Sequence, residues 1–261
     1  MQISFSKAAT PKADAIVLPV FEDDNSALAA LDAEAGGSLS KAARAAGFTG
    51  KKDKSLDIIT PAGIEANRVL LFGAGKAKEF GRLDAEALGG GAVARLMAMR
   101  EKSASFALMN VTAPALGEDE LAARIAYGAL LRSHRFDRYR TKLDVEQKPA
   151  LVKLVMQTSS TRAKTVFAEF EKIARGAFLT RDLVFEPPNI LYPESFAQRC
   201  RALEPLGVKV TVLNVAQMKK LGMGALLGVG QGSAKEARLV AMEWMGGKIG
   251  AAPVAFVGKG V

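Results

Sequence analysis

The stretch RVLLFGAGKAKEFGRLDAEALGGGAVARLMAMREKSASFALMNV, residues 68–111, decides the fold class. It opens with an apolar run at 68–75, continues with helix-forming residues at 84–102, and returns to an apolar run at 104–111. Apolar runs separated by helical segments are typical of βαβ units, whose strands lie parallel in one sheet. The three glycines inside the helical segment would let a neighbouring element approach closely. We therefore expect two parallel strands joined by a helix.

The same alternation of strand and helix extends along the rest of the chain. It predicts an α/β fold, with an amino-terminal three-layer α/β domain around a mainly parallel sheet, a linker helix, and the first part of a second α/β domain. The further strands expected are 13–21, 56–63, 151–159, 208–214, 237–245 and 253–261. The further helices expected are 26–47, with a break at Gly36-Gly37, and 117–133, 161–184, 192–207 and 215–224.

The helix at 161–184 marks the division between the two domains. It is longer than a typical globular helix, it precedes the stiff pair Pro187-Pro188, and its apolar residues recur at spacings of three and four. These apolar positions are Val166, Phe167, Phe170, Ile173, Ala174 and Ala177. We expect domains at 1–160 and 183–261, joined by a linker helix at 161–182.

The chain closes on PVAFVGKGV, residues 253–261, where an apolar run is broken by Gly258, Lys259 and Gly260. The apolar run has the pattern of a buried strand, and it is only the third strand of the second domain. A sheet this small would leave an apolar face and an open edge uncovered. The expectation is therefore that the second domain is incomplete in this chain.

Composition indicates an ordinary globular protein. Hydrophobic residues make up 49% of the chain and charged residues 24%, which argues against wholesale disorder. The single cysteine excludes an intrachain disulfide and suits a reducing compartment. The opening residues lack the apolar core of a secretory signal, and no window is apolar for the roughly 18 residues of a membrane span. We expect a cytoplasmic protein without a membrane segment.

The net charge of +9, from 36 basic and 27 acidic residues, would suit an acidic partner such as nucleic acid. The densest basic stretch is LRSHRFDRYRTK, residues 131–142, where only Asp137 opposes the positive charge. Its basic residues are Arg132, Arg135, Arg138, Arg140 and Lys142. Two interpretations stay open at this point: a solvated segment or subunit contact, and a contact with nucleic acid.

Two glycine-rich segments are weak candidates for nucleotide binding. Gly73 and Gly75 follow a strand, but Lys78 stands where the dinucleotide fingerprint needs its third glycine, so a structural turn is the better interpretation. The segment 228–238 carries three alternate glycines and lacks the Gly-Lys-Ser/Thr of a phosphate-binding loop. We expect this second segment to be a tight connection between strands.

His134 and Cys200 are the remaining candidates for chemistry. His134 is the only histidine and has no nearby cysteine or carboxylate pair, which excludes a histidine-rich zinc site. Cys200 lies in the middle of an expected helix and is interpreted as a small buried hydrophobe. Residue chemistry by itself therefore predicts no complete catalytic site.

Several motifs together resemble the leucyl aminopeptidase, or cytosol aminopeptidase, family of metallopeptidases. The specific ones are RDLVFEPPNILYPESFA at 181–197, LGMGALLGVGQGSAKEARLVAMEW at 221–244 and PVAFVGKGV at 253–261. LLFGAGKAKEF at 70–80 and HRFDRYRTK at 134–142 are similar to the family's amino-terminal domain. One departure is Phe185, because the family commonly has asparagine before the Glu-Pro pair. The resemblance covers nearly the whole chain.

The resemblance implies a two-domain subunit whose carboxy-terminal domain carries two divalent metal ions, typically zinc, manganese or magnesium. These ions activate a water for attack on the first peptide bond of a peptide substrate, and the subunits form a homohexamer. Lys259 matches the lysine that binds one of the two ions. No catalytic residue and no other cofactor-binding residue is assigned within this chain, because the family's acidic ligands, catalytic lysine and arginine follow the GKG motif.

A lysine amine binds a metal only when it is uncharged, and burial beside a dication favours the uncharged form. One amine cannot hold two hard divalent ions, which need several oxygen ligands. We therefore expect a metal-dependent aminopeptidase with a leucine-like preference, inactive as this chain alone. The alternative is a DNA-binding or oligomer-forming module without catalysis.

Overall fold

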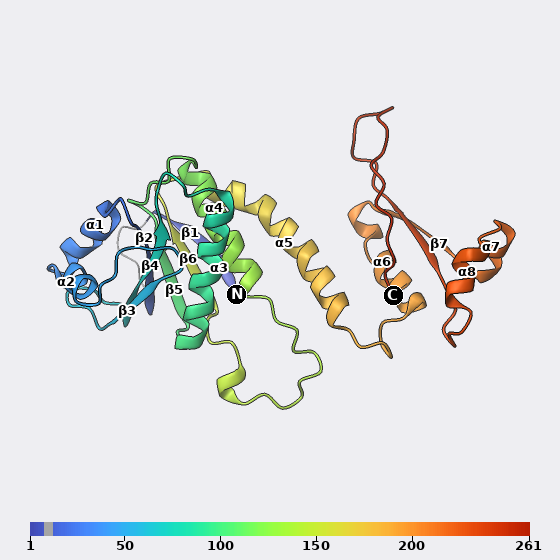
Figure 1. Cartoon of the computed structure of the whole chain (residues 1–261), viewed down its shortest axis with the longest axis horizontal. Coiled ribbons are helices and arrows are strands. Elements are labelled where there is room, and N and C mark those ends of the chain that lie inside the picture. The colour runs from blue at the N-terminus through green and yellow to red at the C-terminus, as the bar shows by residue number, and fades with distance from the viewer. Residues whose placement is uncertain (8–12) are drawn as a thin grey trace. The chain divides into compact units, whose positions relative to one another are not determined.

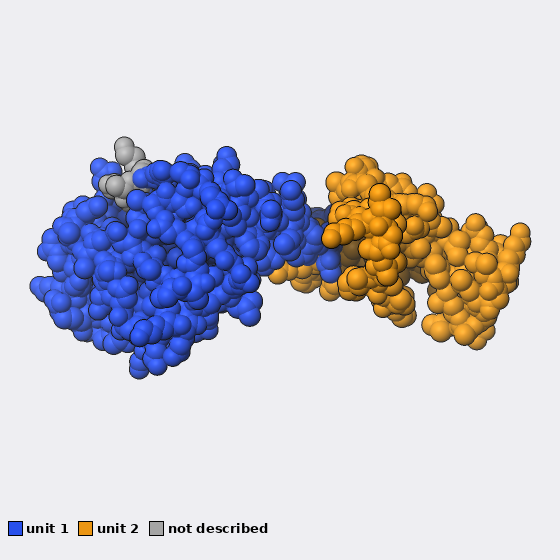
Figure 2. Space-filling model, turned by 90° about the horizontal axis from the view of Figure 1, so that it is seen from above, with its two compact units in different colours: residues 1–180 blue, residues 181–261 orange. Residues whose placement is uncertain are grey.

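The computed structural model describes residues 1–7 and 13–261, and the chain divides into two compact units, Met1–Thr180 and Arg181–Val261 (Figure 2). The first unit contains a six-stranded sheet with the strand order β1-β6-β5-β2-β4-β3. All neighbouring strands in it are parallel except β3, which runs antiparallel to β4. The predicted mainly parallel sheet is confirmed. The strands are β1 (Gln2–Ser6), β2 (Ala15–Phe21), β3 (Ser55–Ile59), β4 (Arg68–Gly75), β5 (Ser103–Ala107) and β6 (Lys153–Gln157).

Helices cover both faces of this sheet, which makes the three layers that the sequence predicts. Helices α1 and α2 lie on one face and α3 and α4 on the other (Figure 1). The chain moves from β2 to β4 in one direction along the sheet and from β4 through β5 to β6 in the other, so right-handed connections place these helices on opposite faces. The helices are α1 (Ser26–Glu34), α2 (Ser38–Ala45), α3 (Arg82–Met99), α4 (Glu118–Arg132) and α5 (Ala163–Phe185), with a 3₁₀ turn, η1, at Val145–Gln147.

The core of the first unit lies around the central strands. Strand β2 is buried along its whole length, and β4 is buried from Val69 onward. Strands covered on both faces need continuous apolar runs rather than alternation, which is why 68–75 could be recognised in the sequence. Ile16, Leu70 and Phe106 are completely buried, and each contributes about 1.5–3 kcal/mol of transfer free energy.

Helices α3 and α4 cross at two glycines, as the glycines of the 84–102 segment suggest. A Cβ atom at Gly89 would lie 2.0 Å from the carbonyl oxygen of Ile125, and one at Gly128 would lie 1.8 Å from that of Glu86. Real Cβ atoms do not approach backbone this closely, so only glycine fits at either position. Beside the crossing, Arg124 bridges Glu86 and Glu120 and ties the two helices electrostatically.

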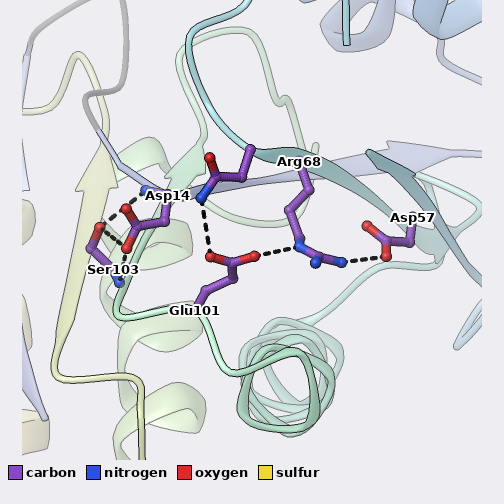
Figure 3. A network of polar contacts seen from close by, with 6 residues as sticks. Asp14, Asp57, Arg68, Glu101 and Ser103 are labelled. Atoms are coloured by element: carbon purple, nitrogen blue, oxygen red, sulfur yellow. Dashed lines mark hydrogen bonds and ion pairs between the residues drawn. The ribbon is translucent and has the colours of Figure 1, made fainter. Parts of the chain in front are cut away.

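A network of polar contacts lies at the beginnings of strands β2, β4 and β5 and reaches Asp57 in the middle of β3 (Figure 3). The Asp14 carboxylate accepts hydrogen bonds from the Ser103 backbone N–H at 2.9 Å and from its hydroxyl at 3.0 Å, and the Asp14 N–H donates to Ser103 Oγ. Arg68 donates from Nε to Glu101 at 2.7 Å and from Nη1 to Asp57. These contacts join the starts of β2 and β5, and link β4 to β3 and to the turn before β5.

The second unit is smaller and contains a two-stranded antiparallel sheet, β7 with β8. The predicted strands at 208–214 and 237–245 are confirmed, but their antiparallel pairing differs from the parallel arrangement expected. The elements are α6 (Pro193–Arg201), a 3₁₀ turn η2 (Glu204–Leu206), β7 (Lys209–Leu213), α7 (Val215–Lys220), α8 (Gly224–Gly230) and β8 (Leu239–Glu243). No helix in the described ranges of either unit is long and apolar enough to span a bilayer.

Two sequence predictions for this unit are wrong. Residues 253–261 form no strand, and the side chains of Val254, Phe256 and Val257 are 81–98% exposed. A strand is stabilised by hydrogen bonds to a neighbouring strand, and within 181–261 no neighbour pairs with this segment. Gly228 and Gly230 lie in helix α8 rather than in a tight turn, so the connection between the strands contains a short helix.

Candidate functional site

The candidate metal ligand Lys259 lies in an exposed segment without regular structure, residues 244–261. The backbone beside it lies against helix α6, because a Cβ at Gly260 would be 2.2 Å from Cε1 of the Phe196 ring. Gly258 faces open space, because a Cβ added there would have no neighbouring atom within 4 Å. The GKG motif is therefore in contact with α6 on one side only.

The first turn of helix α6, which the GKG motif contacts, is fixed by local hydrogen bonds and by a proline. The Tyr192 N–H donates to Ser195 Oγ at 3.0 Å, and Pro193 occupies the first helical position, where no N–H is needed. Glu194 in the first turn accepts a hydrogen bond from Arg238 Nε at 2.6 Å. Because Arg238 directly precedes β8, this ion pair joins α6 to the two-stranded sheet.

The residues around Lys259 do not fit a pair of divalent ions. Across 1–7 and 13–261 there is no group of three or more His, Cys, Asp or Glu side chains that could hold a metal. Hard divalent ions need several oxygen donors, and Lys259 would supply a single amine. The described residues thus include one predicted ligand, Lys259, but not the group of oxygen donors that a pair of ions needs.

His134 and the basic stretch make local contacts in the first unit. The His134 ring stacks on Phe178 of α5, with 4.8 Å between ring centroids. Arg135 donates to Asp137 at 2.7 Å, and this contact lowers the pKa of the Asp137 carboxyl. Arg138 lies over the ring of Phe136, 5.7 Å from its centroid. Residues 133–137 are partly buried and residues 138–142 are exposed, and the stretch forms no regular structure beyond Arg132.

The other candidates from the sequence have structural roles. Gly73 has no room for a side chain, since a Cβ would lie 2.0 Å from the Lys51 carbonyl oxygen, and Gly75 adopts a φ of 78°. The two glycines therefore have a structural role, but the predicted turn is wrong, because both lie in the last part of β4, where its register with β2 shifts. Cys200 is 6% exposed, and burial raises the pKa of its thiol, so the interpretation as a small buried hydrophobe is confirmed.

Comparison with known proteins assigns both units. Residues 17–143 match the amino-terminal domain of the cytosol aminopeptidase family, and residues 178–261 match its catalytic domain. The chain belongs to the cytosol aminopeptidase family. A probable cytosol aminopeptidase of Rhizobium rhizogenes is 43% identical over all of this chain, and one of Caulobacter vibrioides is 39% identical. The alignments cover 52% and 53% of those proteins, so the chain spans about half the length of the curated relatives it matches.

Solved structures share the fold of this chain. A mutant of tomato leucine aminopeptidase matches with a TM-score of 0.77 and 24% identity, over 93% of this chain and 50% of that one. The bottromycin maturation enzyme BotP, in complex with Mn, matches with a TM-score of 0.69 and 24% identity, over 88% of this chain and 45% of BotP. At this identity the similarity supports the α/β fold.

The departure from the cytosol aminopeptidase motif at Phe185 lies at the surface. Its ring is 61% exposed at the end of α5, so an aromatic residue there does not disturb the core. The neighbouring Glu186 is different, because its side chain is 1% exposed and accepts a hydrogen bond from Arg199 of α6 at 3.3 Å. A buried carboxylate needs such a partner, and this pair anchors the chain where the catalytic domain begins.

Sequence reasoning missed strand β1 and three further features of these units. It did not identify the Glu186–Arg199 pair, nor the contact of Gly260 with Phe196, since neither spacing has a recognised signature. It also missed a cavity of about 400 Å³ beside β1 in the first unit. Of the candidate site residues named from the sequence, none lines that cavity, which takes its walls from segments about 130–170 residues apart in the chain.

Proposed function

We propose that this chain is the amino-terminal domain and the beginning of the catalytic domain of a metal-dependent aminopeptidase. The enzyme would remove amino-terminal residues, with a leucine-like preference, from peptides. The observation that carries the proposal is the match of residues 178–261 to the family's catalytic domain, with Lys259 inside the matched region. Curated relatives that align with the whole of this chain are named probable cytosol aminopeptidases, which supports the same activity.

In this proposal the chain has domains at 1–160 and 183–261 joined by the helix at 161–182, and Lys259 is a ligand of one of two divalent ions. Manganese, zinc or magnesium would suit the site, and the Mn in the BotP structure supports a divalent ion. A pair of such ions supplies activation of water for attack on a peptide bond. Because the described residues hold no ligand set, we assign the remaining ligands to the part of the relatives that this chain does not span.

Three further properties belong to the proposal. The chain by itself would be inactive, since its single amine cannot hold two ions. The complete enzyme would work in the cytoplasm as a homohexamer, as the resemblance implies. The DNA-binding alternative gains no support, because Arg135 and Arg140 both lie within 4 Å of the Asp137 carboxylate rather than forming an unopposed basic surface.

The test uses the 261-residue chain and a fusion of it with the second half of the Rhizobium rhizogenes relative. Hydrolysis of leucyl p-nitroanilide is measured with Mn²⁺, Zn²⁺ or Mg²⁺, and bound metal is counted by mass spectrometry of the purified proteins. We expect no metal-dependent turnover by the chain alone, and turnover with two ions per subunit in the fusion. In the fusion, Lys259→Ala should lose one ion, whereas the matched control Lys248→Ala should keep both.

Metal-dependent turnover by the 261-residue chain would contradict the claim that it is inactive alone. A Lys259→Ala fusion that retains both ions with unchanged affinity would contradict the role assigned to Lys259. A fusion that folds and binds metal but cleaves no amino-terminal residue would refute the activity itself.

A further inference from the structure

The cavity of about 400 Å³ in the first unit runs along the outer edge of the sheet. It is lined by the consecutive residues 1–5, by Leu130 of α4 and by one side of α5. Successive side chains of a strand point to opposite faces, so a hollow that touches five residues in a row must follow the backbone edge of the strand. Its volume lies within the range of about 300–1,000 Å³ that is usual for ligand sites.

Strand β1 leaves main-chain groups available at this edge. Its only neighbour among the described strands is β6. The Gln2 N–H donates to the Val152 carbonyl at 2.8 Å, and the Ser6 carbonyl accepts from Thr158 at 3.0 Å, so the even-numbered residues face β6. In a parallel ladder alternate residues bond to one neighbour, so the N–H and C=O groups of Ile3 and Phe5 point outward. Such groups are a template for another extended chain.

The floor of the groove is apolar and its two ends carry opposite charges. Phe5 packs against Phe167 with 5.5 Å between ring centroids, and Leu130 adds to this apolar surface. Lys164 and Glu171 are seven residues apart on α5, which is two helical turns or about 10 Å. Helix α5 begins after the end of β6, beside Ser6, so Lys164 lies toward the end of β1 and Glu171 toward its start.

From this geometry we propose that the groove beside β1 binds an extended peptide segment, which adds a strand parallel to β1. The peptide's backbone bonds to Ile3 and Phe5, and an apolar side chain packs on Phe5, Phe167 and Leu130. The parallel direction follows from charge, because it places the amino-terminal side of the peptide near Glu171 and the carboxy-terminal side near Lys164. Glu171 also pairs with Arg175 at 3.2 Å, but both side chains are exposed and such a pair is weak.

The charge spacing specifies a sequence pattern for the ligand. Side chains on one face of a strand recur every second residue, and residues four apart are separated by about 13 Å. A basic residue, an apolar residue two positions later and an acidic residue two positions further would meet Glu171, the apolar floor and Lys164 in that order. The groove contains no residue of the proposed metal site, so the two proposals can fail separately.

The test is binding of a fluorescent peptide SKSLSES, with its amino and carboxyl termini free, to the 261-residue chain, followed by fluorescence anisotropy. The reversed peptide SESLSKS is the control ligand. We expect saturable binding of the first peptide and weaker binding of the second. Ile3→Pro removes one outward donor and no bond to β6, and proline is tolerated at such edge positions, so it should weaken binding about fivefold with an unchanged circular dichroism spectrum.

Charge exchange tests the direction of the peptide without touching the strand. The double variant Lys164→Glu with Glu171→Lys should prefer the reversed peptide, whereas Lys172→Glu, exposed on α5 outside the groove, should leave the preference unchanged. Failure of SKSLSES to saturate, or an unchanged preference in the double variant, would overturn the proposal. So would sedimentation showing that chains associate through this edge and that Ile3→Pro dissociates them, since a second copy would then be the occupant.

Discussion

Replacement of Gly128 by alanine should separate helices α3 and α4 and destabilise the first unit. The added Cβ would lie 1.8 Å from the Glu86 carbonyl oxygen, and this oxygen belongs to helix backbone and cannot rotate away. The crossing is equally tight at Gly89, where an added Cβ would lie 2.0 Å from the Ile125 carbonyl oxygen. The helices must therefore move apart, and the apolar contacts beneath them loosen.

Two opposing effects set the size of the change. Overpacking a tight contact costs about 1–3 kcal/mol, and a clash with backbone belongs at the upper end of that range. Alanine is favoured over glycine inside a helix by about 1 kcal/mol, which offsets part of the cost. The net destabilisation is then about 2 kcal/mol. For a unit of this size, at about 2–4 °C per kcal/mol, the melting temperature should fall by about 4–8 °C.

Urea unfolding of the first unit, followed by far-UV circular dichroism and by hydrogen exchange in α3 and α4, measures this change. Gly176→Ala is the matched control, because Gly176 lies in α5 and has nothing within 4 Å of an added Cβ. The control should gain up to about 1 kcal/mol from helix propensity alone. A Gly128→Ala variant as stable as the control would refute the close crossing.

Three other expectations follow from the same structure. Arg68→Met leaves the Glu101 carboxylate, which is 12% exposed, without its 2.7 Å partner, and should lower the free energy of unfolding in urea by about 1–3 kcal/mol. The control Arg82→Met, at an exposed arginine, should change the free energy of unfolding by less than about 1 kcal/mol. Equal effects of the two substitutions would contradict this expectation. The hydrogen bond from Lys52 lowers the pKa of Asp84, so the stabilisation is present above the unfolded-state pKa of about 3.9 and is lost as pH falls through the lower folded value. Asp84→Asn should therefore be less stable than the wild type at pH 7, with the difference shrinking below about pH 4; a difference independent of pH would count against it. The Cys200 thiol should react with Ellman's reagent slowly in the native chain and rapidly in urea, because burial raises its pKa and blocks access; rapid reaction of the native chain would show that α6 is more open than described.

Local patterns in the sequence predicted most of the elements and their order, but not strand β1 or helix α8. The apolar run at 68–75 and the helical periodicity of 161–184 report on neighbours only a few residues away, so both could be recognised before the fold was known. The motifs at 181–197 and 253–261 indicated the cytosol aminopeptidase family in the same way. Of the candidate metal site, the sequence predicted one ligand, Lys259. The other ligands could not be predicted, because a single lysine does not indicate which side chains lie beside it in the fold.

Tertiary structure alone decided which strands pair and what each segment contacts. Strand β1 pairs with β6 about 150 residues later, and this pairing, together with the packing of Phe5 on Phe167, creates the groove. Residues 253–261 have the composition of a strand but no ladder partner within the described residues, so they stay irregular. Composition and periodicity act over a few residues, whereas strand pairing and side-chain contacts depend on segments brought together from distant parts of the chain. That difference in range is the physical reason why the sequence predicted most of the elements, whereas the tertiary structure decided their partners and whether the strand at 253–261 forms.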